Sequence, residues 1–180
     1  MSKRWPATAT RRAGSRVHAR SVQSRYVDGI VIRPLRGGDT ATVLAVFERL
    51  GADSRRRRFG GAKTHLTTVE LELLARVDAE HHVLAAYVSG DAQPAGLARL
   101  VRDGSAAEVA FEVVDEQHGR GIGSALADAL AADARAAGIA ELHATVAGDN
   151  ARAVSLLARS SRRLRATRLG AERRVVAALD

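Results

Sequence analysis

The sequence predicts one domain of the α/β (α+β) class, in which a mixed, mostly antiparallel sheet is flanked by helices. The chain has 180 residues, of which 46% are hydrophobic, enough for one sizeable core but short for two domains. Three consecutive apolar runs of strand length are joined by the short turns GDAQP and DGS, which is typical of an antiparallel meander. Runs with helical periodicity precede and follow this meander, so helices are expected on the faces of the sheet.

Turn residues and apolar periodicity place the elements in the order βααβββαβα, with a final ββ hairpin. Asp39 or Thr40 is expected to cap the first helix, and Thr67 or Thr68 the second. Residues 52–66, which contain the run RRRRF, are predicted to form a basic loop broken by glycines. The predicted strands are residues 30–35, 81–90, 94–103, 107–115 and 140–148, the predicted helices are residues 40–51, 68–78, 122–137 and 150–161, and the hairpin covers residues 164–179.

Composition excludes several kinds of protein. Aromatic residues make up only 3% of the chain, so the core is expected to be aliphatic. There is no cysteine, which excludes disulfide scaffolds, thiolate zinc sites and cysteine nucleophiles. No apolar run approaches the roughly 20 residues that span a bilayer, so no membrane partner and a cytoplasmic location are expected. The six histidines show no metal-ligand spacing, and no metal site is predicted.

Positive charge is concentrated at the start of the chain. Residues 1–29 hold seven Lys and Arg and one acid, Asp28, whereas the rest of the chain holds 21 basic and 19 acidic residues. We predict that residues 1–29 form a basic, disordered arm before a folded domain over residues 30–180. The arm could contact nucleic acid or an acidic partner, although a solvated arm is the favoured interpretation, and no nucleic-acid binding is predicted for the rest of the chain.

The run DEQHGRGIGSALADAL, residues 115–130, puts three glycines between a strand-like run and a helical run. Glycine allows positive φ and close approach, and the unpaired N–H groups at a helix N-terminus favour a phosphate there. A dinucleotide fingerprint would need Gly or Ala where Ser124 stands, within a parallel βαβ unit. A nucleoside-triphosphate loop would need a lysine that this turn lacks. A turn without any ligand stays open at this point.

The same turn resembles the acyl-CoA-binding motif Q/R-x-x-G-x-G/A of the GNAT superfamily of N-acetyltransferases, with a His where the family has Gln or Arg. The resemblance covers about residues 30–180 and includes the element order. It implies the GNAT fold and acetyl-CoA as co-substrate, with no metal. It also implies that the turn holds the pyrophosphate of coenzyme A, through backbone amides and an arginine, with the residues His118, Gly119, Arg120, Gly121, Ile122, Gly123 and Ser124.

Residues 50–86 are similar to the segment before the meander in bacterial protein-lysine acetyltransferases. This narrower resemblance implies a primary amine as acceptor and favours a protein lysine. A small-molecule amine acetyltransferase of the aminoglycoside or polyamine type stays open as an alternative. So does a non-catalytic acyl-CoA-binding domain whose basic arm attaches it to nucleic acid. The formation of a homodimer is left open as well.

Transfer to lysine needs a base, because taking a proton from an amine of pKa about 10.4 at pH 7 costs about 4.6 kcal/mol. The strand-like run SAAEVAFEVVD supplies the carboxylates Glu108 and Glu112. Four residues apart in a strand, they would share a face with Ala110 and Val114, unless the bulge that the family carries there intervenes. Glu108 is favoured because its AE-x-A context matches the base position of the protein-acetyltransferase relatives.

The resemblance assigns further roles near the site. A backbone N–H near Val113 or Val114 would polarise the acyl carbonyl. Asn150 would cap the helix that it opens and also contact the pantetheine arm. Many relatives carry a Tyr as general acid where this chain has Leu157, so no Tyr acid is expected from that helix.

Overall fold

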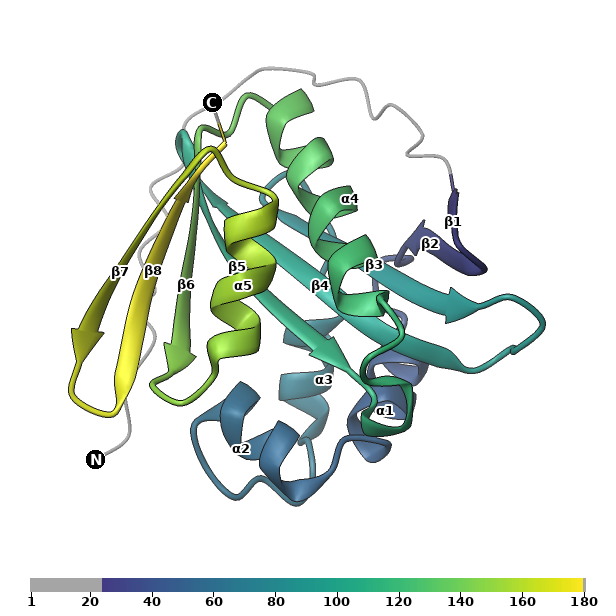
Figure 1. Ribbon diagram of the computed structural model, residues 1–180. Coiled ribbons are helices and arrows are strands. Elements are labelled where there is room, and N and C mark those ends of the chain that lie inside the picture. Colours follow the sequence, from purple (N-terminus) through teal and green to yellow (C-terminus); the bar gives the residue numbers. More distant parts are fainter. Residues whose placement is uncertain (1–23, 180) are drawn as a thin grey trace.

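Eight strands form a single sheet in the computed structural model, which describes residues 24–179 (Figure 1). The strands lie in the order β1-β2-β3-β4-β5-β6-β8-β7, and every neighbouring pair is antiparallel except β5 and β6. The strands are β1 Arg25–Val27, β2 Ile30–Pro34, β3 His81–Val88, β4 Pro94–Asp103, β5 Ala106–Val113, β6 Glu141–Ala147, β7 Arg163–Leu169 and β8 Glu172–Ala178.

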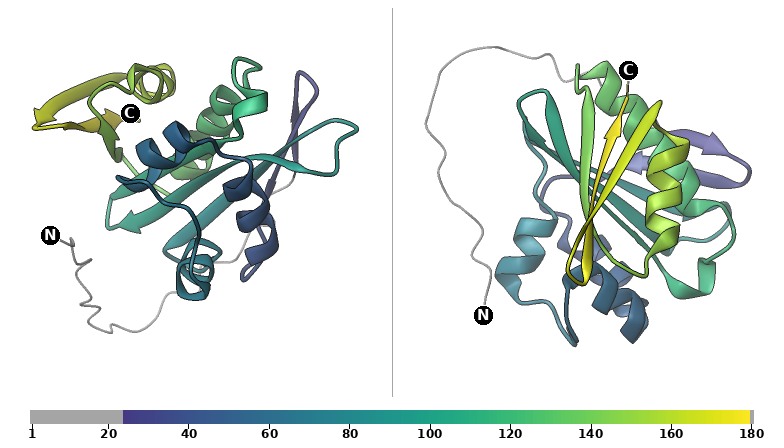
Figure 2. Two further views of the ribbon diagram at one scale, coloured as in Figure 1. Left: turned by 90° about the horizontal axis from the view of Figure 1, so that it is seen from below. Right: turned by 60° about the vertical axis from the view of Figure 1, so that its left-hand side comes forward.

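Helices cover both faces of the sheet (Figure 2). Helices α1, α2 and α3 lie on one face, and α4 and α5 lie on the other. Asp39 caps α1 by accepting a hydrogen bond from the Thr42 N–H at 3.0 Å, and Thr67 caps α3 in a capping box with Glu70. Of the two candidates predicted for each helix, Asp39 and Thr67 are therefore the caps. The helices are α1 Thr40–Glu48, α2 Ala52–Phe59, α3 Thr68–Leu74, α4 Ile122–Ala136 and α5 Ala151–Arg159.

The core consists of two largely aliphatic clusters, one on each face of the sheet. Strand β3 contributes to both, because alternate side chains of a strand point to opposite faces. Leu84 and Ala86 pack toward α4, whereas Val83 and Ala85 pack toward α1. The alanine-rich face of α4 lets this helix lie close to the sheet, and the predicted aliphatic core is confirmed.

Strands β5 and β6 are paired over only three residues. Ala106 to Glu108 lie beside Glu141 to His143 in parallel, and no pairing of the two strands continues beyond them in the described residues. The strands then separate toward the N-terminus of α4, as Figure 1 shows. This separation leaves a gap in the middle of the sheet, and the candidate site lies in it.

Two elements in the structure differ from the sequence prediction. Strand β1 lies within residues 1–29, which were assigned to the arm, so the folded part begins before residue 30; residues 1–23 lie outside the described part of the chain. Helix α2 lies within residues 52–66, where a loop was predicted. Arginine is a good helix former, and Gly60, at φ 73°, ends the helix in the left-handed conformation that favours glycine. The glycines around this segment therefore mark the two ends of a helix.

The remaining elements match the prediction closely, including the final hairpin of β7 and β8. Strand β5 carries no bulge, since its pairing with β4 is regular from Ala106 to Val113. The register shift of this sheet region lies instead in the pairing of β3 with β4, where Ala86 and Tyr87 pair with Gly96 and Pro94 and leave Ala95 as the extra residue. No helix between residues 24 and 179 has the length and hydrophobicity needed to cross a bilayer.

Candidate active site

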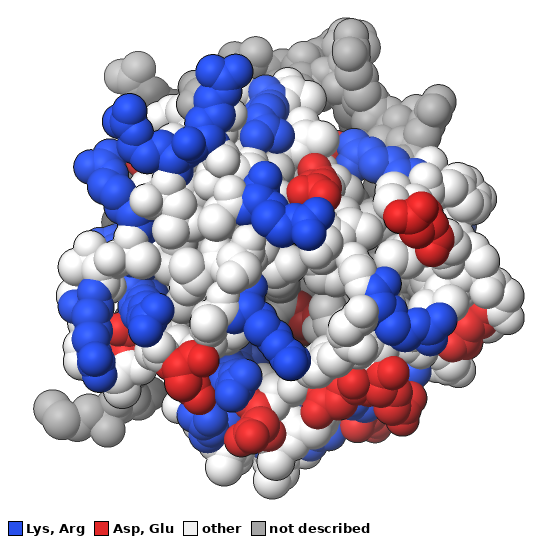
Figure 3. Space-filling model, viewed as in Figure 1, with Lys and Arg blue, Asp and Glu red and all other residues white. Residues whose placement is uncertain are grey.

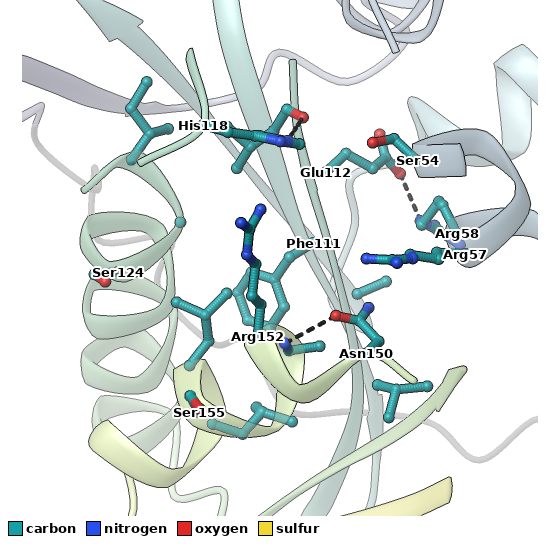
Figure 4. Close-up of a pocket in the computed structure, with 18 of the residues that line it drawn as sticks. Ser54, Arg57, Arg58, Phe111, Glu112, His118, Ser124, Asn150, Arg152 and Ser155 are labelled. Atoms are coloured by element: carbon teal, nitrogen blue, oxygen red, sulfur yellow. Dashed lines mark hydrogen bonds and ion pairs between the residues drawn. The ribbon is translucent and has the colours of Figure 1, made fainter. Parts of the chain in front are cut away.

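A cavity of about 700 Å³ lies where β5 and β6 separate. Five segments line it: the second half of β5, the middle of β6, the glycine turn with the start of α4, one side of α5, and α2. Figure 4 shows α4 and α5 on one side of β5 and α2 on the other. The cavity is therefore lined by elements from both faces of the sheet.

The glycine turn forms one end of this cavity. Gly119 and Gly121 have φ of 78° and 82°, in the left-handed region where a side chain would be strained. Gly121 is the N-cap of α4 and offers no side-chain cap, and the first bond of the helix runs from the Ala125 N–H to the Gly121 carbonyl. The N–H groups of residues 122–124 consequently have no helical partner, and these residues line the cavity. This is the arrangement that binds phosphate groups.

Gly123 is bare for a different reason. A Cβ at this position would lie 3.3 Å from Leu156 Cδ1 of α5, so the absence of a side chain lets α5 approach α4. Ser124 also lines the cavity, directly after this close contact. The three glycines of the turn thus serve two purposes, backbone conformation and helix packing.

His118 and Arg120 are arranged differently from what the motif implied. His118 lines the cavity, and its Nε2–H donates to the carbonyl of Val113 at 2.9 Å, which holds the turn against the end of β5. Arg120 does not line the cavity, and its guanidinium donates to Gln117 Oε1 at 2.6 Å. The side chain of Arg120, which was expected to contact a phosphate, is thus bound to another residue of the turn in this structure.

Hydrogen-bond alternation along β5 decides which backbone groups face the gap. The Val114 N–H donates to the Ala95 carbonyl at 3.0 Å, so it is engaged in the pairing with β4 and does not face the gap. In an antiparallel pair, successive N–H groups of one strand point alternately toward the partner strand and away from it. The N–H groups of Val113 and Phe111 therefore point away from β4 and toward β6. Both residues line the cavity. Val113 remains a candidate carbonyl-binding residue, and Phe111 is one that the sequence reasoning missed.

Glu112 is the only acidic side chain among the described residues that line the cavity. Its side chain is 3% exposed, and its Oε1 accepts from Arg58 Nε at 2.7 Å and from Arg99 Nη1 at 3.0 Å. Burial alone would raise the pKa of Glu112, but the charges of Arg99 and Arg58 outweigh it and hold the pKa below its usual value. Glu112 is therefore an ionised carboxylate fastened between two guanidinium groups.

Glu108 lies outside the cavity lining and is exposed. It pairs with His143 at the last paired position of β5 and β6, immediately before Val109, where the lining begins. With regular pairing along β5, Glu108 and Glu112 share a face of the sheet, as expected. No ion pair of Glu108 is seen within the described residues.

Asn150 is the N-cap of α5, and its Oδ1 accepts from the Ala153 N–H at 3.1 Å (Figure 4). It also lines the cavity, so the capping part of the prediction is confirmed and a contact to a ligand is sterically available. Leu157, seven residues further on, also lines the cavity and is 2% exposed. No Tyr contributes to the part of the lining that the structure describes.

The sequence analysis assigned the arginines of α2 to a basic loop and not to the site. Arg57 and Arg58 line the cavity, and Arg57 Nη2 also contacts Asp149 Oδ2 at 3.3 Å, just before Asn150. Helix α2 thus bridges β5 and the turn before α5. One signal in the sequence was available: Arg99 stands within an apolar strand at an inward position, where a charge needs a buried partner.

A small group of metal-ligand side chains lies away from the cavity. Atoms of Asp78, Glu80 and His81 come within 4.8 Å of one another at the exposed turn before β3. Asp78 Oδ1 already accepts from the N–H groups of Glu80 and His81 and contacts His81 Nδ1. These hydrogen bonds stabilise the turn and explain why the three side chains lie close together.

Comparisons with known proteins agree with this geometry. A family model described as "Acetyltransferase (GNAT) family" matches residues 46–161. "Acetyltransferase Pat" of Mycolicibacterium smegmatis is 35% identical over 133 residues, which are 72% of this chain and 40% of that protein, so the chain spans less than half the length of this relative.

Two solved structures show the same fold. The GNAT domain of S. lividans PAT superposes with a TM-score of 0.74 at 25% identity, over 83% of this chain and 90% of that one. Spermidine N-acetyltransferase from Vibrio cholerae, in complex with CoA and spermine, superposes with a TM-score of 0.64 at 16% identity, over 85% of this chain and 97% of that one, and supports the fold alone. The chain belongs to the acetyltransferase (GNAT) family.

Proposed function

We propose that the protein transfers an acetyl group from acetyl-CoA to a primary amine, and that the acceptor is a lysine of a protein. The observation that carries this proposal is the junction of two features in one cavity. A phosphate-binding helix N-terminus and an unpaired strand edge both open onto it. A phosphate carrier with an extended, amide-containing arm fits both features together.

The donor would be bound by the backbone more than by side chains. The N–H groups at the start of α4 suit the pyrophosphate, and Asn150 suits the arm that follows it. The N–H of Val113, or that of Phe111, suits the acyl carbonyl, since both point into the gap. Acetyl-CoA itself supplies an activated thioester.

Transfer requires the acceptor amine to lose a proton before its nitrogen attacks the thioester carbon. The new N–C bond then replaces the C–S bond, and the sulfur leaves as a thiolate that takes up a proton. We assign the role of base to Glu108, which lies on the acceptor face at the point where β5 and β6 part and has no cationic partner among the described residues. Glu112 is less suited, because two guanidinium groups hold its pKa below the usual range.

A protein lysine is favoured over a polyamine by the charge of the cavity. Four arginines and one glutamate line it, and a polycationic acceptor would be repelled there. The similarity of residues 50–86 to protein-lysine acetyltransferases points in the same direction. Arg57 and Arg58 lie within this similar segment.

Two measurements on the purified chain test the proposal. Calorimetry with acetyl-CoA should give a Kd in the micromolar range or tighter, about −8 kcal/mol. Incubation with acetyl-CoA and a panel of lysine peptides, an aminoglycoside and a polyamine should release CoA thiol with the peptides, and mass spectrometry should find the added acetyl group on lysine. Absence of binding refutes the choice of donor. Binding with no transfer to any amine refutes the enzyme assignment.

A further inference from the structure

We propose that the acceptor lysine is flanked by an acidic residue, whose carboxylate is bound by Arg57 and Arg58 of α2. This inference rests on the proposed function, because it concerns the acceptor of the same site. It identifies the acceptor by its chemistry, as a primary amine that carries an anionic group next to it.

Positive charge exceeds negative charge in the cavity. The charged side chains that line it are Glu112 and four arginines, Arg57, Arg58, Arg152 and Arg159. Arg99 adds a further positive charge behind Glu112, at 3.0 Å. One buried carboxylate therefore faces several guanidinium groups, and the cavity as a whole suits an anion.

The phosphates of the donor account for only part of this charge. Side chains of β5 alternate between the faces of the sheet: Val109 packs in the cluster under α4, whereas Val114 packs in the cluster under α1. Arg152 and Arg159 belong to α5, on the face of the phosphate-binding turn. Arg57 and Arg58 enter from α2, on the opposite side of β5, as Figure 4 shows. Their charges lie where the acceptor has to approach.

Arg57 has hydrogen-bonding capacity to spare. Its one ion partner within the described residues is Asp149, whose side chain is 55% exposed and is also contacted by Arg56 at 3.7 Å. The Nε of Arg57 is buried without a hydrogen-bond partner in that part of the chain. Figure 4 shows the guanidinium of Arg57 directed into the cavity. A carboxylate can occupy two N–H groups of such a guanidinium at once.

The surface beside the cavity has the same character. The β7–β8 hairpin, on the left in Figure 3, is rich in arginine and has one acid, Glu172. Arg168 and Arg173 are directly opposite each other across the two strands, a pairing of like charges that an anionic partner would relieve. The arginines of this region are Arg162, Arg163, Arg165, Arg168, Arg173 and Arg174, and they project from both faces of the hairpin, because successive side chains of a strand alternate. An acidic protein surface around the acceptor lysine would complement the positive charge of this hairpin.

Two peptides and three forms of the protein test this inference. The peptides share one lysine and differ only in its two neighbours, Glu in one and Gln in the other. The proteins are the wild type, Arg57→Gln and the matched control Arg56→Gln, which removes the same charge from the same helix and also contacts Asp149, but does not line the cavity. We expect kcat/KM to be at least tenfold higher for the Glu peptide in the wild type. This ratio should fall below about threefold in Arg57→Gln and persist in Arg56→Gln, with the Kd for acetyl-CoA unchanged in both.

Each other outcome overturns the inference. Equal kcat/KM for the two peptides in the wild type would show that no flanking carboxylate is recognised. An unchanged ratio in Arg57→Gln would remove the assigned residue. Weaker acetyl-CoA binding by Arg57→Gln, or a preference for succinyl-CoA that this variant loses, would place the anion on the donor. Lack of transfer to every peptide would instead refute the proposed function, which distinguishes the two failures.

Discussion

Arg58 Nε donates to Glu112 Oε1 at 2.7 Å, and this ion pair fastens α2 to β5 at the cavity. Arg99 donates to the same oxygen from β4, so three elements meet at one carboxylate. The arrangement makes Glu112 a structural anchor, so replacing Glu112 should have different consequences from replacing Glu108.

Glu112→Gln should destabilise the fold. The substitution removes the one negative charge between two poorly exposed guanidinium groups, which typically costs about 3 kcal/mol. Urea unfolding at pH 7 measures the loss, and Glu108→Gln, at an exposed position, should stay within about 0.5 kcal/mol of the wild type. Equal stability of the two variants would contradict the anchoring role.

Glu108→Gln should slow transfer without weakening donor binding. Loss of a general base lowers turnover by roughly 100-fold, whereas the amide side chain keeps the size of the residue. Steady-state kinetics with a lysine peptide and calorimetry with acetyl-CoA separate the two effects. A 100-fold loss in a folded Glu112→Gln variant, with Glu108→Gln fully active, would move the base to Glu112.

Stability should decrease on acidification. Burial would raise the pKa of Asp133, but hydrogen bonds from His82 and Arg25 hold it below its usual value, and the pKa of Glu112 is lowered by Arg99 and Arg58. A carboxylate with a lowered folded-state pKa stabilises the fold above its unfolded pKa of roughly 4, and this contribution is lost as the pH falls through the folded-state value. Unfolding free energies at pH 7, 5 and 3 should therefore fall mainly below pH 5. Asp133→Asn should show a shallower fall, and an identical pH profile would argue against its role.

Gly121→Ala should impair both stability and donor binding. At φ 82° a Cβ is strained, at a cost of roughly 1–2 kcal/mol, and a rotated turn would misdirect the N–H groups at the start of α4. Gly104→Ala, in the β4–β5 turn at φ 61°, is the control, with similar strain outside the cavity lining. We expect a Kd for acetyl-CoA about tenfold weaker in Gly121→Ala and unchanged in Gly104→Ala, as one charged hydrogen bond would give. A parallel change in both would indicate a global effect.

Much of the fold could be predicted because its signals are local. Caps such as Asp39 and Thr67, and alternation in β3, β4 and β5, are visible in short stretches of sequence. Helix α2 was missed because its residues are charged and its packing depends on partners far along the chain, among them Glu112 and Asp149. Strand β1 was missed because three exposed or half-exposed residues carry little pattern.

The candidate site was predicted in outline but not in its charges. The turn from His118 to Ser124 could be recognised because bare backbone leaves a glycine pattern. The engagement of Arg120 with Gln117, and of Val114 with Ala95, depends on tertiary geometry that no spacing encodes. Arg58 and Arg99 both bind Glu112, although they lie 54 and 13 positions from it along the chain. Only the folded structure reveals that they converge.

The regular, unbulged pleat of β5 gives the parity of a residue number a meaning. Odd positions such as Val109 and Phe111 face α4, where the proposed donor site lies, and even positions such as Glu108 and Glu112 face the opposite side, from which the proposed acceptor would approach. Strand β5 thus separates the two sides of the site and presents a different set of side chains to each. Under the proposed function, substitutions at even positions would change the choice of amine and those at odd positions the choice of acyl group, with Glu112 the exception because it also anchors α2.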